Sequence, residues 1–115
     1  MNDNDNIKRV IRERNRLKEI INYVEANIDT NLQGRTVAEK CNVSVSTLFH
    51  LFKKHHRLSF HTYVEMQRMD KALHLLQNAG MSVKEVMYAT GYKNKKTFNK
   101  AFKKKFRYTP GHFKI

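Results

Sequence analysis

The chain has 115 residues, which is enough for one compact unit or for two very small ones that share a core. Its apolar content of 40% suits a folded protein rather than a disordered basic tail. Its 23 Lys and Arg residues against 10 Asp and Glu give a net charge of +13, and such a field attracts polyanions: nucleic acid first, then an acidic membrane surface or acidic proteins.

No apolar run approaches the roughly 20 residues that a membrane-spanning helix needs, and the polar start MNDNDN is unlike a signal peptide. We therefore expect an intracellular, cytoplasmic protein with no membrane partner. The single cysteine, Cys41, excludes an internal disulfide and completes no zinc-binding pattern, so it is expected to be a small core residue.

The first predicted helix runs over about residues 7–27. Its apolar residues recur at helical spacing and are Leu17, Ile20, Ile21, Val24 and Ile28. The stretch 7–16 is basic and has a thinner apolar stripe, so we expect it to project beyond the core. Residues 1–6 are expected to be disordered, with Asp5 or Asn6 as the cap of the helix.

A first helix-turn-helix pattern follows. A short helix is predicted over about 34–41, and Ser44 is a typical N-cap for the next helix, over about 45–55. The residues that this pair of helices should bury are Val37, Ala38, Cys41, Leu48, Leu51 and Phe52.

Ser59 is the expected cap of a long helix over about 60–78, which the sequence NAG at 78–80 ends. The apolar stripe of this helix consists of Phe60, Tyr63, Val64, Ala72, Leu73 and Leu76. Ser82 and Glu85 then match a capping box for a helix to about residue 89. The apolar residues of that helix are Val83, Val86 and Met87.

The last part of the chain repeats the same layout. Asn94 is the expected cap of a helix over about 95–105, and Pro110 begins a final short turn or seventh helix. No segment has the pattern of a strand. We predict an all-α fold with two helix-turn-helix subdomains joined by a long linker helix, about seven helices in all. The predicted parts are a tail and basic helix extension at 1–16, a first subdomain at 17–58, the linker helix at 59–78 and a second subdomain at 79–115.

The two subdomains are copies of one another. Shifting the sequence SVSTLFHLFKKHHRLSFHTY at 44–63 by 50 positions aligns it with NKKTFNKAFKKKFRYTPGHF at 94–113. The shift places cap on cap and Phe-Lys-Lys on Phe-Lys-Lys. The preceding short helices align with a shift of 49, Val37 with Val86, so the second turn is one residue longer. The sequence therefore predicts a repeated helix-turn-helix.

The predicted helix near 95–105 has two contrasting faces. Phe98, Ala101, Phe102 and Phe106 share one face. The opposite face carries Lys96, Asn99, Lys100 and Lys103, flanked by Lys95 and Lys104. A solvated cationic face is one interpretation. A phosphate-lined groove is the other, because it removes the repulsion between these cations and uses Asn and Lys on base edges.

The equivalent face in the first copy carries Ser46, Phe49, His50 and Lys53. An outward Phe49 adds nothing to folding. It is interpreted as a contact to thymine methyl groups in a major groove. The alternatives are a cover for a partner protein or a core residue whose phase on the helix differs from the one assumed.

The length of the linker helix sets the expected spacing between the two reading helices. Its 19 or so residues span roughly 28–30 Å, against about 34 Å for one turn of DNA. A rigid helix of this length is expected to hold two reading helices in consecutive major grooves on one side of a duplex, with DNA bending absorbing the mismatch.

Other chemistry finds little support. The histidines at 50, 55, 56 and 61 lack a carboxylate or cysteine that would complete a metal set. No nucleophile–base pair, phosphate-binding glycine loop or catalytic carboxylate pair is present. We expect no metal, no cofactor and no enzymatic activity.

Three segments carry a resemblance to a known family. VAEKCNVSVSTLFHLFKK, SFHTYVEMQRMDKALHLL and VKEVMYATGYKNKKTFNKAFKKKFRYTPGHF together resemble the DNA-binding domain of the AraC/XylS family of bacterial transcription regulators. The match runs from about Leu17 to Phe113. Its second half is the more specific, because Gly91-Tyr92 stands where the family has Gly-Phe and is followed by Phe98, Phe102-Lys103 and Thr109-Pro110.

The resemblance implies that both recognition helices enter the major groove. The base-facing candidates it implies are Ser46, Phe49 and His50 in the first copy and Lys95, Lys96, Thr97, Asn99 and Lys100 in the second. The candidates for phosphate contact are Lys53, Lys54, Lys103 and Lys104, with Ser44 and Asn94 near the helix starts. The resemblance also implies activation by touching RNA polymerase, and we expect binding to double-stranded DNA as a monomer.

The chain departs from the family pattern at several positions. The family usually has Gly where Arg57 and Arg107 end the recognition helices, so each Arg should either adopt a strained left-handed conformation or move the cap. Met87 replaces a customary Ala, which is expected to separate that helix pair. Gly34 weakens the start of its helix.

Most members of the family carry a further ligand-binding or dimerising domain, for which this chain has no room, so we expect no small-molecule effector domain. It is either a stand-alone regulator, which the initial Met favours, or the C-terminal part of a longer protein, which the basic stretch 7–16 favours. Two rival functions are a basic adaptor that coats nucleic acid without sequence preference and a protein-interaction module that uses Phe49.

Overall fold

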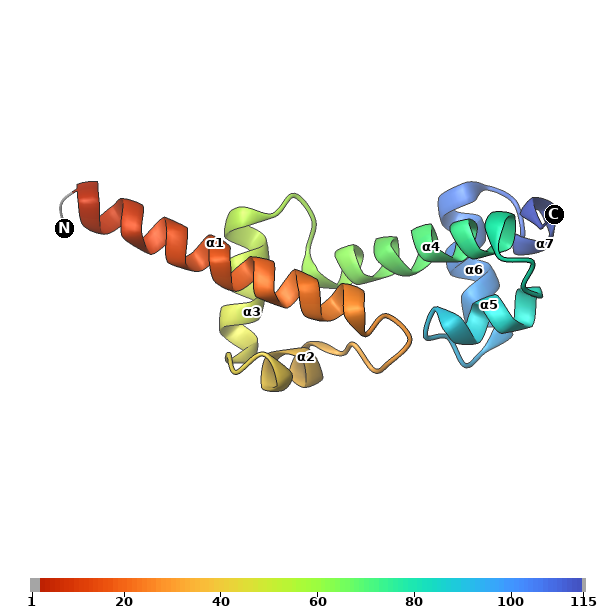
Figure 1. Cartoon of the computed structure of the whole chain (residues 1–115), viewed down its shortest axis with the longest axis horizontal. Coiled ribbons are helices and arrows are strands. Elements are labelled where there is room, and N and C mark those ends of the chain that lie inside the picture. The colour runs from red at the N-terminus through yellow and green to blue at the C-terminus, as the bar shows by residue number, and fades with distance from the viewer. Residues whose placement is uncertain (1–2, 115) are drawn as a thin grey trace. The chain divides into compact units, whose positions relative to one another are not determined.

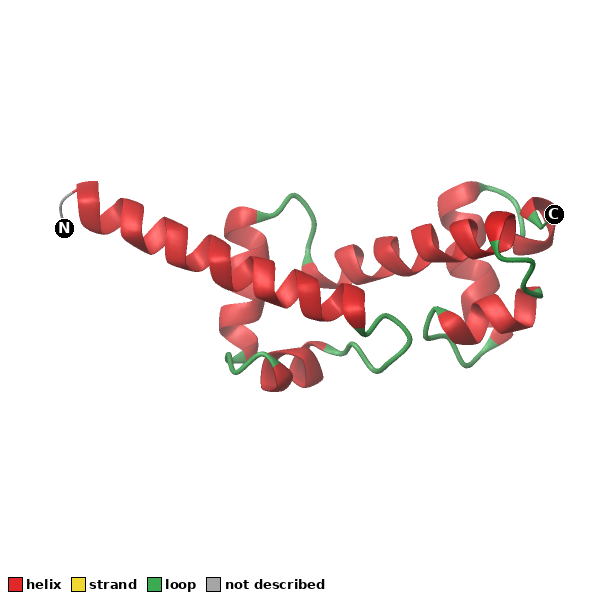
Figure 2. Cartoon of the chain, viewed as in Figure 1, coloured by secondary structure: helices red, strands yellow, loops and turns green. Residues whose placement is uncertain are grey.

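The computed structural model describes residues 3–114. Its seven helices, with no strand in the described part of the chain, confirm the predicted all-α fold (Figures 1 and 2). Their bounds are α1 (Asp3–Ala26), α2 (Gly34–Lys40), α3 (Val45–His55), α4 (Phe60–Asn78), α5 (Val83–Ala89), α6 (Lys95–Phe106) and α7 (Pro110–Phe113). None of these helices is long and apolar enough to cross a membrane.

The chain forms two compact units. The first comprises the residues up to Asn27 together with Leu32–Tyr63, and the second comprises Ile28–Asn31 and the residues from Val64 onward. Each unit contains one helix-turn-helix pair, α2–α3 in the first and α5–α6 in the second. The boundary between the units falls within α4.

Helix α1 begins earlier than the sequence suggested. Residues 3–6, which were expected to be disordered, are helical, so the cap expected at Asp5 or Asn6 is wrong. Two acids in the first turn, Asp3 and Asp5, explain the extension, because carboxylates stabilise the positive end of the helix dipole. The first two residues of that predicted disordered stretch lie outside the described part of the chain. Towards its N-terminus α1 extends beyond the other helices of its unit (Figure 1), and Ile7 and Ile11 are exposed there.

The core of the first unit lies where α1, α2 and α3 pack on one another and on the start of α4. Its buried residues are Leu17, Ile20, Val24, Leu32, Val37, Ala38, Leu48, Leu51, Phe52, Phe60 and Tyr63. Phe52 joins α3 to α4, with ring centroids 5.4 Å from Phe60 and 5.5 Å from Tyr63. Cys41 and Ile21, which were expected in the core, are only partly buried.

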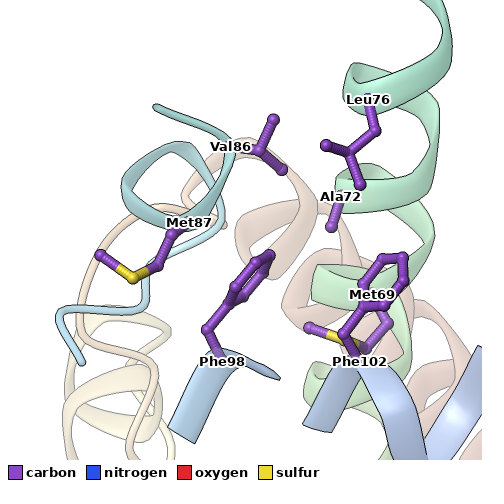
Figure 3. Close-up of a cluster of buried hydrophobic side chains, with 7 residues drawn as sticks. All are labelled: Met69, Ala72, Leu76, Val86, Met87, Phe98 and Phe102. Atoms are coloured by element: carbon purple, nitrogen blue, oxygen red, sulfur yellow. The ribbon is translucent and has the colours of Figure 1, made fainter. Parts of the chain in front are cut away.

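The core of the second unit brings α4, α5 and α6 together (Figure 3). Its buried residues are Met69, Ala72, Leu76, Val86, Met87, Phe98 and Phe102. Phe98 and Phe102 are fully buried, and each such side chain contributes roughly 1.5–3 kcal/mol relative to exposure. The sequence pattern predicted every member of this cluster except Met69.

The predicted caps are confirmed in four helices. The side chains of Ser44, Ser59, Ser82 and Asn94 accept hydrogen bonds from backbone N–H groups three residues on, at 3.0, 3.3, 3.1 and 3.0 Å. The Glu85 carboxylate in turn accepts a hydrogen bond from the Ser82 N–H at 3.1 Å, which completes the capping box. These caps fix where α3 and α6 begin.

The second unit also contains a clasp formed by Arg68 of α4. Its guanidinium donates to the Thr30 carbonyl oxygen at 2.8 Å and lies over the Tyr92 ring, 5.6 Å from the centroid. Gly91 has φ +88°, and a Cβ there would lie 2.8 Å from the Ile28 carbonyl oxygen. Only glycine fits this position without strain. Together, the close approach of Gly91 and the contacts of Arg68 hold the segment Ile28–Asn31 against the turn before α6.

Candidate nucleic-acid interface

Helix α6 presents lysines on the side opposite its buried phenylalanines. Lys96, Lys100, Lys103 and Lys104 are all exposed, and no ion pair involving them is found in the described residues. Their neighbour Lys105 differs, because its ammonium lies 2.7 Å from the carboxylate of Asp70 on α4. The lysines of the predicted outward face therefore have no acidic partner among the described residues, and they lie next to one lysine that has a partner.

The start of α6 is fixed by Asn94, whose side chain accepts from the Thr97 N–H at 3.0 Å. Lys95 and Thr97 are exposed beside it. Asn99 differs from its neighbours because it is half-buried, and its amide oxygen is covered without a hydrogen-bond partner in the described structure.

Helix α3 presents Ser46, His50, Lys53 and Lys54 to solvent. Its first turn is held by Ser44, which accepts from the Thr47 N–H at 3.0 Å and lies 2.8 Å from the Thr47 hydroxyl. The structure thus leaves all the predicted site residues exposed except Asn99. Exposure permits contact with DNA, and the individual roles stay predictions.

Phe49 lies at the rim of this face rather than fully outside it. Its side chain is 39% exposed, and its ring centroid lies 6.1 Å from Phe60 and 5.6 Å from His61. A Cβ on Gly34 would lie 2.9 Å from the tip of the ring. Gly34 therefore makes room for Phe49, a contact between α2 and α3 that the sequence pattern alone did not reveal.

Glu13 of α1 gathers basic groups of α3. Its carboxylate accepts a hydrogen bond from Lys54 Nζ at 2.8 Å, and the same oxygen lies 3.3 Å from His55 Nε2. The second oxygen lies 3.7 Å from His50 Nε2. The bond from Lys54, followed by that from His55, lowers the pKa of Glu13 to about 2 despite partial desolvation. Glu13 is therefore ionised throughout the physiological range.

A shallow hollow lies beside the helix-turn-helix pair of each unit. The first, about 490 Å³, adjoins the C-terminal end of α3 and includes Phe49, Lys53, Arg57 and Phe60. The second, about 390 Å³, has Met87 and Phe98 among its lining residues together with Lys84, Lys93 and Lys95. Lys84 and Lys93 are exposed cations that the sequence reasoning did not assign to the site, and Arg57, a position where the chain departs from the family pattern, is exposed as well.

The metal-ligating side chains and the single cysteine complete the description of the surface. No group of three or more metal-ligating side chains comes together within residues 3–114. Burial, followed by the charge of Glu19, raises the pKa of the Cys41 thiol, so at neutral pH it stays protonated and a poor nucleophile.

Comparison with known proteins assigns the chain to a family. A family model described as a helix-turn-helix domain matches residues 37–114. This range contains the C-terminal part of α2 and all of α3 to α7. The chain belongs to the AraC family of helix-turn-helix transcription regulators. This confirms the resemblance inferred from the sequence, and the AraC-type domain is the DNA-binding part of such regulators.

Relatives and solved structures agree with this assignment. The Msm operon regulatory protein of Streptococcus mutans is 32% identical over 100 residues, which cover 87% of this chain and 35% of that protein. The chain thus spans about a third of the length of this curated relative. The C-terminal domain of AraT, a response regulator from Geobacillus stearothermophilus, is 27% identical with a TM-score of 0.81, covering 85% of this chain and 82% of that one.

A further solved structure shares the fold. The DNA-binding domain of AdpA, a global transcriptional factor solved in complex with a target DNA, has a TM-score of 0.78 at 20% identity. The alignment covers 84% of this chain and 87% of that domain. The names of these proteins describe a regulatory protein, a response regulator and a transcriptional factor.

Proposed function

We propose that this AraC-family chain binds double-stranded DNA in a sequence-specific manner by inserting α3 and α6 into successive segments of the major groove. One observation carries the proposal. Helix α6 buries Phe98 and Phe102 and leaves Lys96, Lys100, Lys103 and Lys104 exposed, with no acidic partner among residues 3–114. A face of like charges has a lower free energy against phosphates than in water.

The residues divide into two roles. Lys95, Lys96, Thr97, Asn99 and Lys100 in α6, with Ser46, Phe49 and His50 in α3, are proposed to face base edges. Lys53, Lys54, Lys103 and Lys104 are proposed to contact phosphates, with Ser44 and Asn94 holding the helix starts beside the backbone. Lys84, Lys93 and Arg57 join the phosphate group, since each is an exposed cation beside a recognition helix.

The proposed site on DNA is asymmetric and covers about two helical turns. Two non-identical reading helices recognise different sequences, so a monomer needs no palindrome. The length of α4, 19 residues, supports a spacing close to one turn between the two halves. If about six phosphates are neutralised, log K should fall with log salt with a slope near −5.

The regulatory role is part of the same proposal. The AraC-type resemblance favours an activator that binds as a monomer in the cytoplasm, on the nucleoid, and contacts RNA polymerase. A reporter gene fused downstream of the selected site would show activation as a rise in expression. A fall in expression would reassign the protein as a repressor without affecting the DNA-binding proposal.

Selection of bound oligonucleotides from a random pool tests the DNA-binding proposal directly. We expect a motif with two parts about one turn apart. The variant Lys100→Ala should then weaken binding to that motif by about 1–3 kcal/mol and affect random DNA less. Absence of any enriched motif would favour the rival function, a basic protein that coats nucleic acid, and equal losses on both DNAs would remove Lys100 from the base-reading group.

A further inference from the structure

We propose that Glu13 is a built-in competitor of DNA phosphate for the basic C-terminal end of α3, so that it restrains non-specific binding by the first copy. The inference rests on the proposed DNA-binding function and adds to it a residue outside both helix-turn-helix pairs. It is carried by the geometry of one carboxylate on α1 against three basic side chains of α3.

The contact between Glu13 and Lys54 depends on how α1 packs on α3. Glu13 and Lys54 are 41 residues apart in sequence, yet the packing of α1 on α3 brings their charged atoms to 2.8 Å. The Glu13 side chain is only 19% exposed and that of His55 only 6%, so part of the contact is packed between α1 and α3. Lys54 and His50 remain accessible, at 36% and 60% exposure.

The chemistry of the contact resembles a phosphate contact. A carboxylate and a phosphate oxygen both accept charge-assisted hydrogen bonds from a lysine ammonium. While Lys54 is paired with Glu13, it is not available to neutralise a DNA phosphate. The carboxylate also repels a nearby phosphate. Phosphate contacts supply most of the affinity for DNA of any sequence. Glu13 therefore restrains sequence-independent binding at the C-terminal end of α3.

Neighbouring residues supply matched controls. Lys53 precedes Lys54 on the same helix and is exposed, but no ion pair involves it in the described residues. Glu19 lies on α1 with Glu13 and is likewise exposed and free of ion pairs there. A Glu19→Gln variant changes the net charge of the protein by the same amount as Glu13→Gln without releasing a lysine of α3.

The test measures affinity for the selected site and for random duplex DNA over a range of salt. Glu13→Gln should tighten binding to random DNA about three- to tenfold near 0.1 M salt and steepen the salt slope by about 0.9, as one added phosphate contact does. Glu19→Gln should give the small general effect of net charge alone. Identical affinities and slopes for the two variants would overturn the proposal.

A double-mutant cycle separates the restraint from a structural role. Lys54→Ala should cost less than Lys53→Ala in the wild type and should abolish the gain in the Glu13→Gln background, whereas Lys53→Ala should cost the same in both. Additive effects of Glu13→Gln and Lys54→Ala would contradict the proposal. Circular dichroism and thermal melting of each variant check that the fold survives.

A second variant covers the case in which Glu13→Gln does not fold. Lys54→Gln leaves Glu13 beside His55 and should weaken wild-type DNA binding less than Lys53→Gln does; an equal or larger loss would overturn the proposal. The proposed function can fail separately, because a specific-to-random ratio near one would refute sequence-specific binding while the effect of Glu13 on random DNA could still be measured.

Discussion

The two helix-turn-helix copies have the same order of helices but differ in the residues at corresponding positions between their helices. Positions 34 and 49 of the first copy correspond to positions 83 and 99 of the second. In the first copy a glycine lies under a phenylalanine ring, and a Cβ would meet that ring at 2.9 Å. In the second copy a larger Val83 accompanies a smaller Asn99. The comparison indicates that the absence of a side chain at position 34 accommodates the Phe49 ring, which has no counterpart at position 99.

The copies also differ in charge. The basic end of α3 faces the carboxylate of Glu13, whereas Lys103 and Lys104 of α6 have no acidic partner in the described residues. More of the positive charge of α6 than of α3 is therefore available to a polyanion. We expect α6 to supply most of the electrostatic affinity and α3 to depend more on base contacts.

The largest expected effect tests whether the two cores are equivalent. Phe98 and Leu48 occupy corresponding positions and are both fully buried. Phe98→Ala should lower the free energy of unfolding by about 3–5 kcal/mol and Leu48→Ala by about 2–5 kcal/mol, because each leaves a cavity. Urea unfolding measures the loss, and amide NMR spectra should show each variant perturbing its own copy. A loss below about 1 kcal/mol would mean that the site collapses or is not part of the core.

A second change makes the first copy resemble the second. Gly34→Val places a branched side chain where the Phe49 ring lies, so overpacking should cost about 1–3 kcal/mol. Thermal unfolding measures the loss. In a Phe49→Ala background the same change should cost much less. An equal loss in both backgrounds would show that helix propensity, and not the ring, disfavours a side chain at position 34.

A smaller effect concerns how the recognition helices end. Arg107 has φ +72°, whereas the first copy ends at His56 with extended backbone and Arg57 avoids positive φ. The two arginines thus took the two alternatives expected from the sequence. Arg107→Gly should stabilise the free protein by about 0.5–1 kcal/mol, because glycine adopts this conformation without strain. Arg57→Gly should bring no gain, and equal melting temperatures for wild type and Arg107→Gly would contradict the strain.

The smallest effect near neutral pH concerns Glu13. Its folded-state pKa of about 2 lies below the ordinary 4.5, so its stabilisation is fully present above pH 4.5 and is lost as the pH falls towards 2. Urea unfolding between these pH values should therefore show a steeper decline for the wild type than for Glu13→Gln. Parallel declines would show that the carboxylate is not held by Lys54 and His55 in solution.

Much of the fold follows from local sequence. The starts of α3, α4, α5 and α6 were predicted because each depends on a cap and an N–H group three residues away. The buried faces of α3 and α6 were predicted because apolar residues repeat at helical spacing. The start of α1 was missed because its first turn is polar throughout, and only the dipole argument for Asp3 and Asp5 signals a helix there.

The candidate site was predictable in its composition but not in its contacts. The exposed lysines of α6 follow from the same periodicity that buries Phe98 and Phe102. The contact of Glu13 with Lys54 joins residues 41 apart, and that of Arg68 with Thr30 joins residues 38 apart. No local pattern encodes such pairs, because they depend on how helices pack. Gly34 was interpreted as a weakness of α2, and only the position of the Phe49 ring gives it a function.

The clasp around Arg68 has a consequence for dissecting the molecule. Because Ile28–Asn31 belongs to the second unit while the residues on both sides belong to the first, the gene cannot be divided at one codon into two self-sufficient halves. A peptide starting anywhere in α4 would lack the Thr30 carbonyl that accepts from the guanidinium. The excised second half should therefore melt at a lower temperature than the same residues in the intact chain, and adding the missing four residues through a designed linker should restore part of the difference.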